Sequence, residues 1–198
     1  MKKSNSWHWD LPLSHIIECI RTLPSGPLVI IGISGYGGAG KTTLAHELGQ
    51  RLPAPVVSLD EFGTNAVFQR SDDWHGFDRP RLVRQVLAPL QNGTLAVQYD
   101  CCDDWNSWET IPTNLVVERF VVLEGVGLFH PDVLPYLDYR IWLDVPLAEA
   151  TTRGIARERL LGRDPGEVWK SLWEPNERDF ERKYQPKESA HSLIRSVP

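Results

Sequence analysis

The sequence predicts a three-layer α/β fold in which helices cover both faces of a mainly parallel central sheet. Short apolar runs typical of buried parallel strands occur at residues 28–33, 55–59, 120–123 and 139–144. Longer segments whose apolar residues recur at helical spacing lie between them. A chain in which strands and helices alternate forms a parallel sheet with helices on its faces.

The first elements follow an N-terminal helical segment, residues 1–27. Its apolar residues recur at helical spacing from residue 11 to residue 23, which predicts a helix. The run 28–33 predicts a buried strand, followed by a glycine-rich turn and a helix with leucines along one face. A further helix is expected from Asp78, which can cap its N-terminus, to Gly93.

The rest of the sequence contains two polar stretches and a C-terminal part that is predicted to be helical. Residues 63–76 and 100–113 lack periodicity and are predicted to be loops, the second preceded by a strand-like run. Residues 147–184 are predicted to be mostly helical, with Trp169 and Trp173 on one stripe that packs into the core.

Composition limits the classes of protein to which the chain can belong. Its 198 residues suit one domain, and 41% of them are hydrophobic, as in a globular fold. The net charge of −5 argues against nucleic acid as a partner. Three cysteines without a C-x-x-C pair predict neither a disulfide framework nor a zinc site, which favours the cytoplasm. No apolar run is long enough to span a membrane, and assembly into a homo-oligomer stays open.

The strongest motif is Gly-Tyr-Gly-Gly-Ala-Gly-Lys-Thr at residues 35–42, which matches the phosphate loop G-x-x-x-x-G-K-[ST] in full. It lies between a predicted strand and a predicted helix, as a P-loop NTPase fold requires. Glycines let the backbone N–H groups turn inward around an anion at the helix N-terminus. Lys41 is expected to hold the β- and γ-phosphates of ATP, and Thr42 to bind Mg²⁺. The expected nucleotide-binding residues of this motif and its helix are Gly35, Gly37, Gly38, Ala39, Gly40, Lys41, Thr42 and Thr43.

Two other classes of P-loop protein fit less well. Asp60 and Gly63 satisfy the D-x-x-G pattern of GTPases, but the sequence has no Asn-Lys-x-Asp motif for reading guanine. A transporter ATPase would be longer and would carry a signature helix, which is absent. No motif distinguishes ATP from GTP.

The ordered set of motifs resembles the uridine kinase family and its relatives, the phosphoribulokinase and pantothenate kinase group. The resemblance covers nearly the whole chain. Its blocks are Gly-Ile-Ser-Gly at 32–35, Ser-Leu-Asp-Glu-Phe at 58–62, Phe-Asp-Arg-Pro at 77–80, Tyr-Asp at 99–100, Leu-Glu-Gly at 123–125, and an arginine-rich stretch at 157–164 that ends in Gly-Arg-Asp. It implies transfer of the γ-phosphate of ATP, with Mg²⁺, to a hydroxyl of a small molecule.

The resemblance also implies roles for two acids that follow predicted strands. Asp60 is implied to be the base that takes the acceptor's proton, although a helix cap or a solvated acid would also fit. Glu124 is implied to hold Mg²⁺, with capping of the next turn as the alternative. In open α/β sheets, ligands bind at the carboxyl ends of the strands, where both acids are expected to lie.

A helical, arginine-rich lid is expected at about residues 150–165. Arg153 and Arg157 repel each other at i, i+4, so an anion such as ATP would relieve them; Arg157 is expected to bind the nucleotide. Arg163 is the best placed for catalysis, and Arg159 lies in the same stretch. A solvated helix face, with Glu149 paired to Arg153, is the alternative.

The acceptor residues are the least defined part of the site. Tyr99 and Asp100 match the block that approaches the nucleoside in the family. Asp104 stands where uridine kinases carry a histidine five residues after that tyrosine. The acceptor is expected to be a uridine- or cytidine-like nucleoside, and a pantothenate-like alcohol, a sugar or a nucleotide are the alternatives. Trp105 and Trp108 could stack on a ring or pack in the core. Trp74 and His75 could also line the acceptor site.

A protein of another class would keep the phosphate loop and lack an acceptor site. Such a nucleotide-dependent switch would bind ATP without phosphorylating a small molecule. The altered residues 100–108 leave this alternative open, whereas Asp60 and Glu124 beside an intact phosphate loop argue against it.

Overall fold

The structure is a computed structural model that describes residues 8–24, 26–163 and 166–197. Its centre is a five-stranded sheet in which all neighbouring strands are parallel, in the order β3-β6-β2-β7-β8. The strands are β2 (Val29–Gly35), β3 (Val56–Ser58), β6 (Phe120–Glu124), β7 (Tyr139–Leu143) and β8 (Ser192–Ile194). The predicted parallel α/β fold is confirmed.

The central strands β2 and β6 are buried along their whole length. A strand covered on both faces has no solvent side, which is why these strands read as continuous apolar runs. The registers place Ile33 of β2 and Ser58 of β3 on either side of Glu124. The polar residues Ser58 and Glu124 therefore lie side by side at the carboxyl ends of β3 and β6.

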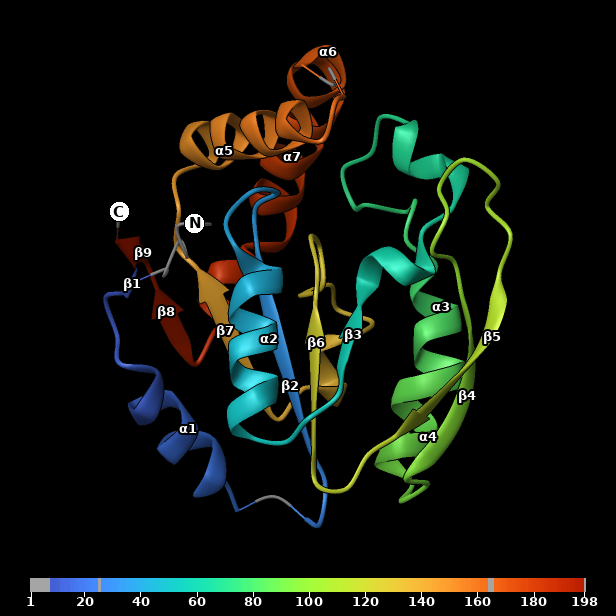
Figure 1. The fold of residues 1–198 in the computed structure, drawn as a ribbon, viewed down its shortest axis with the longest axis vertical. Helices are drawn as coiled ribbons and strands as arrows, with labels where there is room; N and C mark the ends of the chain where they lie inside the picture. Colours follow the sequence, from blue (N-terminus) through green and yellow to red (C-terminus); the bar gives the residue numbers. More distant parts are fainter. Residues whose placement is uncertain (1–7, 25, 164–165, 198) are drawn as a thin grey trace.

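Helices surround this sheet and gather over the edge where these strands end. α2 (Lys41–Arg51) packs against β2, β3 and β6. Figure 1 shows α5, α6 and α7 above the carboxyl ends of the central strands. The remaining α-helices are α1 (Leu13–Arg21), α3 (Arg79–Leu82), α4 (Ala88–Gln91), α5 (Leu147–Leu160), α6 (Gly166–Val168) and α7 (Glu174–Tyr184). No helix of the described ranges is long and apolar enough to cross a lipid bilayer.

The helix predicted from Asp78 to Gly93 is present but irregular. The Asp78 carboxylate accepts a hydrogen bond from Arg81 N at 3.0 Å, which confirms the expected cap. A π-helical turn, Val83–Leu87, separates α3 from α4. Pro89 has no N–H to donate to the carbonyl of Gln85, and the π turn comes just before it.

The loop predicted for residues 100–113 is confirmed over residues 102–110, and its two ends belong to a separate antiparallel hairpin. The hairpin consists of β4 (Ala96–Cys101) and β5 (Ile111–Val116), which pair outside the central sheet. Most residues of β5 are exposed, with Leu115 as its buried side chain. Without an apolar alternation the strand has no period-two pattern to recognise.

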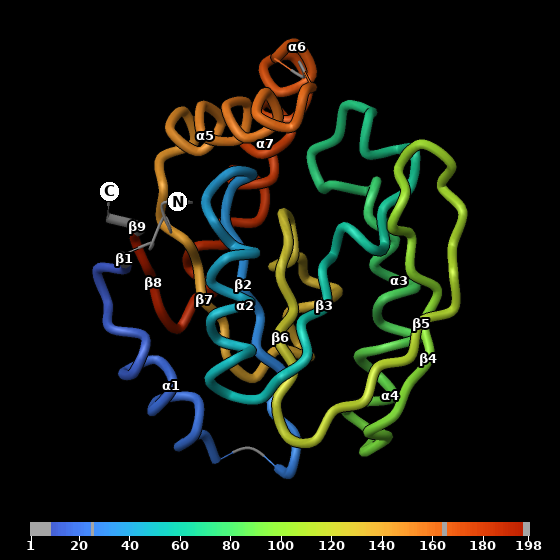
Figure 2. Tube along the Cα trace, viewed as in Figure 1, coloured from blue at the N-terminus to red at the C-terminus, as the bar shows by residue number. Residues whose placement is uncertain are grey.

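Short elements complete the fold, and most of them were not predicted. Figure 2 follows the chain into β8 beside β7 and back to the small pair β1 and β9. Two- and three-residue strands are too short to produce a sequence pattern. The two-residue strands are β1 (His8–Trp9) and β9 (Ser196–Val197). The short helical turns are the 3-10 turns Leu59–Phe62, Asn65–Phe68, Leu134–Tyr136 and Pro186–Ser189 and the π turn Trp169–Trp173.

Candidate functional site

The phosphate loop, residues 35–42, joins the buried strand β2 to α2. Gly38 and Gly40 have φ values of 84° and 101°, a region that residues with a side chain rarely adopt. The Lys41 side chain is buried, and its Nζ donates a hydrogen bond to the Tyr36 carbonyl at 3.0 Å. The ammonium group is thereby held inside the curve of the loop, where an anion would be bound.

Helix α5 lies directly against this loop. A Cβ at Gly38 would be 2.1 Å from the carbonyl oxygen of Ala150 and 2.7 Å from the nitrogen of Gly154. The indole of Trp169 also fits between Gly37 and Gly154, since a Cβ at either glycine would be within 2.8 Å of it. The phosphate loop is thus covered by α5 and the π turn that follows it.

Three oxygen-bearing side chains meet where β3, β6 and α2 converge. Glu124 Oε1 accepts hydrogen bonds from Ser58 Oγ at 2.9 Å and from Thr42 Oγ1 at 3.2 Å. Glu124 is only 4% exposed. Mg²⁺ prefers such hard oxygen ligands and is bound by one or two carboxylates together with phosphate oxygens. The residues present therefore fit the expected metal.

Asp60 belongs to the 3-10 turn Leu59–Phe62, which continues from the end of β3. Asp60 is exposed on the wall of a pocket. Desolvation raises its pKa to about 6, and the Glu124 charge acts in the same direction. Lys41 and Arg157 act in the opposite direction. Asp60 therefore shares one electrostatic environment with the phosphate loop, the Glu124 carboxylate and α5.

That pocket, called the site pocket below, has a volume of about 700 Å³. It extends from the phosphate loop to an aromatic wall of Phe68, Trp105 and Trp173. The Phe68 ring stacks on Trp173 and meets Trp105 edge-on, with centroids 6.0 and 6.3 Å apart. The predicted residues that line it are Gly37, Gly38, Lys41, Thr42, Asp60, Trp74, Asp104, Trp105, Glu124, Arg157 and Arg163.

The acceptor residues expected from the sequence divide into two groups. Asp104 and Trp105 line the site pocket, and Trp105 Nε1 donates to the carbonyl of Asp60 at 3.1 Å. Tyr99 is buried behind it, stacked on Phe62, and its hydroxyl donates to Glu61 Oε2. Burial, together with that hydrogen bond, raises the pKa of Tyr99 above its usual range.

Three other residues considered from the sequence do not line the site pocket. The Asp100 carboxylate accepts from Gln85 Nε2 at 2.7 Å. His75 Nδ1 lies 2.9 Å from Ser71 Oγ. Trp108 stacks on Trp105, with ring centroids 5.6 Å apart.

The predicted lid arginines meet on a single buried acid. Arg157 Nε and Nη2 donate to Glu158 Oε1, and Arg163 Nη1 donates to Glu158 Oε2 at 2.9 Å. Both guanidinium groups are more than half exposed. Arg153 instead pairs with Glu149 along α5, as in the solvated-face alternative. Asp164, the last residue of the predicted lid, lies outside the described residues.

Sequence reasoning missed several side chains of the pocket. Ser58 is recognisable in retrospect as a hydroxyl at a strand end, two residues before Asp60. Glu158 lies inside the arginine-rich stretch 157–164, where only the arginines were considered. Glu177 comes from a helix that is distant in sequence from the motifs, so no local pattern marks it. Trp169, expected only in the core, lines the pocket beside Gly37.

A second cavity of about 760 Å³ lies on the other side of Tyr36. The start of α5, with Pro146 and Leu147, forms one wall, and Trp142 forms another. Asp144 at its edge is paired with Lys187 and Arg195. The phosphate loop is therefore flanked by two cavities, one on the Asp60 side and one on the β7 side.

Comparison with known proteins gives a consistent picture. A uridine kinase of Lactobacillus helveticus is 30% identical over 158 residues, which cover 73% of this chain and 71% of that protein. The structure is similar to a possible uridine kinase from Bacillus stearothermophilus, with a TM-score of 0.70, 17% identity, and coverage of 91% of this chain and 96% of that one. A candidate fructose transport system kinase from Silicibacter gives a TM-score of 0.74, 24% identity, and coverage of 92% and 98%. These two likenesses concern the fold.

Other comparisons set limits on this picture. The chain spans only 29% to 33% of the length of several longer curated relatives. No family model matches the chain.

Proposed function

This chain belongs to the uridine kinase family, and on that premise we propose that it transfers the γ-phosphate of ATP to a hydroxyl group of a nucleoside. Its relatives include uridine kinases, and the chain is an ATP-dependent kinase of a small molecule. The identity of the acceptor and the roles of the individual residues are the proposal.

The observation that carries the proposal is the position of Asp60. Its carboxyl group lines the same pocket as Lys41 and Glu124 on one side and Trp105 on the other. An acceptor stacked on the aromatic wall would present its hydroxyl to Asp60 beside the phosphates. In the transfer, a bond forms between the hydroxyl oxygen and the γ-phosphorus, and the bond from that phosphorus to the bridging oxygen of ADP breaks. Asp60 takes the hydroxyl proton.

The remaining groups neutralise charge. Lys41 holds the phosphates from within the loop, while Arg157 and Arg163 leave Glu158 to pair with the ATP phosphates as the lid adjusts. When bound by Thr42 and Glu124, Mg²⁺ supplies positive charge to the phosphate oxygens. The cavity beside Tyr36 adjoins the phosphate loop and combines apolar residues, among them Trp142 and Leu147, with charged ones, so we assign it to the base of the nucleotide donor.

The charges of the site pocket favour an uncharged acceptor. Among the described residues that line it, the cationic side chains are Lys41, Arg157 and Arg163. All three adjoin the phosphate loop or the lid. The opposite end is lined by Glu61, Asp104 and aromatic rings, which would repel the carboxylate of a pantothenate-like alcohol or the phosphate of a nucleotide.

The aromatic wall favours a nucleoside over a simple alcohol as the acceptor. A base can stack on Trp105 or Phe68, while its ribose reaches Asp60. The buried Trp74 Nε1 has no hydrogen-bond partner among the described residues and supplies a donor for an acceptor oxygen. A sugar would use the same aromatic and acidic groups, so the acceptor is decided by experiment.

The test is an acceptor screen with ATP labelled in its γ-phosphate. Uridine, cytidine, purine nucleosides, hexoses, pantothenate and nucleoside monophosphates are offered to the wild type and to the Lys41→Ala and Asp60→Asn variants. Label on a nucleoside, lost in both variants, is expected. Label on pantothenate or a monophosphate alone would refute the charge argument. ATP binding without labelling of any acceptor would favour the nucleotide-dependent switch.

A further inference from the structure

Glu177 of α7 places a carboxylate against the phosphate loop. It is 4% exposed, and its Oε1 accepts a hydrogen bond from the backbone N–H of Gly37 at 2.7 Å. Its second oxygen, Oε2, is buried without a hydrogen-bond partner among the described residues. Both Glu177 and Gly37 line the site pocket. A buried carboxylate is costly, so its retention at this place calls for a role beyond packing.

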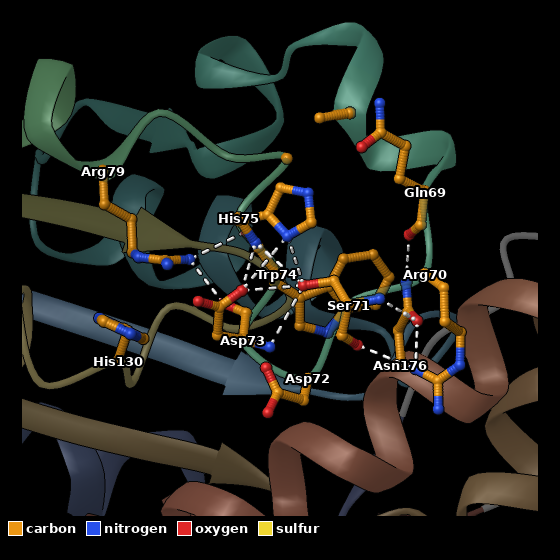
Figure 3. Close-up of polar contacts among 12 residues, drawn as sticks. Gln69, Arg70, Ser71, Asp72, Asp73, Trp74, His75, Arg79, His130 and Asn176 are labelled. Carbon is orange, nitrogen blue, oxygen red and sulfur yellow. Dashed lines mark hydrogen bonds and ion pairs between the residues drawn. The ribbon is translucent and has the colours of Figure 1, made fainter.

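The preceding residue of α7 holds the opposite side of the site. Asn176 is fully buried, and Figure 3 shows it beneath the segment from Gln69 to Ser71. Its Oδ1 accepts from Ser71 N at 2.9 Å and from Arg70 Nη1 at 2.6 Å. Its Nδ2 donates to the carbonyl of Gln69 at 2.9 Å. The side-chain amide therefore satisfies three polar groups of one loop.

The loop held by Asn176, residues 63–76, also forms the aromatic end of the site pocket. It carries Phe68 and Trp74. One turn before Asn176, Trp173 Nε1 donates to the carbonyl of Val67 at 3.1 Å. The helical turn at the junction of the π turn and α7 is thus hydrogen-bonded to the phosphate loop through Glu177 and to the acceptor-side loop through Trp173 and Asn176.

We propose that Glu177 is a positioning residue: with Asn176 it makes α7 a brace that sets the separation between the bound ATP and the acceptor. This inference rests on the proposed function. Glu177 touches the loop and not the reacting atoms in this account, so it acts through Gly37. Lys41 and Thr42 bind phosphate and metal without it, and ATP binding alone does not require the brace.

The brace matters because phosphoryl transfer depends on alignment more than on covalent chemistry. A displacement of about 1 Å between reacting groups can cost roughly a hundredfold in rate. Water can attack the γ-phosphate from many directions, whereas the acceptor hydroxyl must be held in line. Loss of the brace therefore lowers transfer to the acceptor more than it lowers ATP hydrolysis.

Two substitutions separate this role from charge and from folding. In Glu177→Gln the amide oxygen still accepts the Gly37 N–H, so the brace is kept while the charge is removed. In Glu177→Ala the contact is lost. Arg182→Ala is the matched control, because Arg182 lies on the same helix, is largely exposed and pairs with Asp179 away from both cavities. Thermal unfolding verifies that each variant is folded.

The experiment measures transfer to the acceptor, ATP hydrolysis without acceptor and the KM for ATP. For Glu177→Ala we expect transfer to fall by roughly tenfold or more, with hydrolysis and the KM for ATP within about threefold of wild type. Glu177→Gln and Arg182→Ala are expected to stay close to wild type in all three. Equal losses of transfer and hydrolysis in Glu177→Ala, or a Glu177→Gln variant as defective as Glu177→Ala, would overturn the proposal.

A second measurement does not depend on the acceptor. Hydrogen exchange of the Gly37 amide, followed by NMR, is expected to be slow in the wild type and in Glu177→Gln and fast in Glu177→Ala. Equal exchange in all three proteins would overturn the brace even where an acceptor is phosphorylated. Slow exchange that is lost only in Glu177→Ala would uphold the contact where no acceptor is found, so the two proposals fail separately.

Discussion

The Glu124 carboxylate accepts a hydrogen bond from the Thr42 hydroxyl at 3.2 Å, joining the end of β6 to the first turn of α2. The two residues are 82 positions apart in the sequence, and the register of the parallel sheet brings them together. Ser58 completes the group from β3. The edge of the sheet therefore presents a carboxylate and two hydroxyls beside the phosphate loop.

This relationship predicts how the enzyme depends on Mg²⁺. Glu124→Gln keeps the shape of the side chain but removes its charge, so the affinity for Mg²⁺·ATP should fall. We expect the Mg²⁺ concentration for half-maximal activity to rise roughly tenfold or more. Activity measured across a Mg²⁺ titration tests this, with Glu18→Gln on the exposed face of α1 as the control. An unchanged Mg²⁺ requirement would show that Glu124 does not hold the metal.

Asp60 predicts the acid limb of the pH profile. A general base must be deprotonated, and desolvation on the pocket wall raises the pKa of Asp60 to about 6. Transfer should therefore be constant above this pKa and fall by roughly tenfold for each pH unit below it. Single-turnover rates across the pH range measure the midpoint. In Asp60→Asn the residual rate should lose this dependence; a variant with the same midpoint would assign the titration to another group.

Gly38 predicts a steric requirement of the loop. Because a Cβ there would lie 2.1 Å from the Ala150 carbonyl oxygen, Gly38→Ala must displace the loop or α5. Strain of about 1–3 kcal/mol corresponds to roughly five- to two-hundredfold in ATP affinity. Calorimetric titration with ATP measures it. Gly26→Ala, which meets no atom within 4 Å, should bind ATP normally, and wild-type affinity in both would contradict the packing described.

The raised pKa of Glu177 predicts that the free energy of unfolding depends on pH. Burial raises the pKa of its carboxyl to about 7, so the folded state holds this proton more tightly than the unfolded state does. Stability should therefore decline as the pH rises toward 7, by about 1.4 kcal/mol for each unit of pKa difference. Glu177→Gln cannot lose a proton, and its stability relative to wild type should grow between about pH 5 and pH 8.

Denaturant unfolding at several pH values measures that difference. Glu18→Gln, on the exposed face of α1 and remote from Glu177, serves as the control for the removal of a surface carboxylate. A Glu177→Gln difference that does not change with pH would mean that Glu177 has the same pKa in the folded and unfolded states.

The sequence predicted those parts of the fold and site that depend on local patterns. The phosphate loop, Asp60 and Glu124 all follow apolar strands, and parallel strands end at one edge of the sheet. Their meeting in one pocket follows from that topology. The roles assigned to these residues stay predictions until the variants are measured.

Other features depend on contacts that no local pattern contains. Tyr99 lies behind the pocket because β4 pairs with β5, whose exposed residues show no alternation. Glu177 reaches Gly37 across 140 positions, and Trp169 lies beside it because two glycines leave room for the indole. The apolar stripe of the C-terminal helices indicated burial but not which loop they would cover.

The most direct test of the central claim is ³¹P NMR of the wild-type protein with Mg²⁺·ATP and a nucleoside mixture. The account predicts that a phosphomonoester signal of a nucleoside grows in step with the ADP signals, and that neither grows with Asp60→Asn. ADP accompanied only by inorganic phosphate, at the same rate with and without nucleosides, would contradict it.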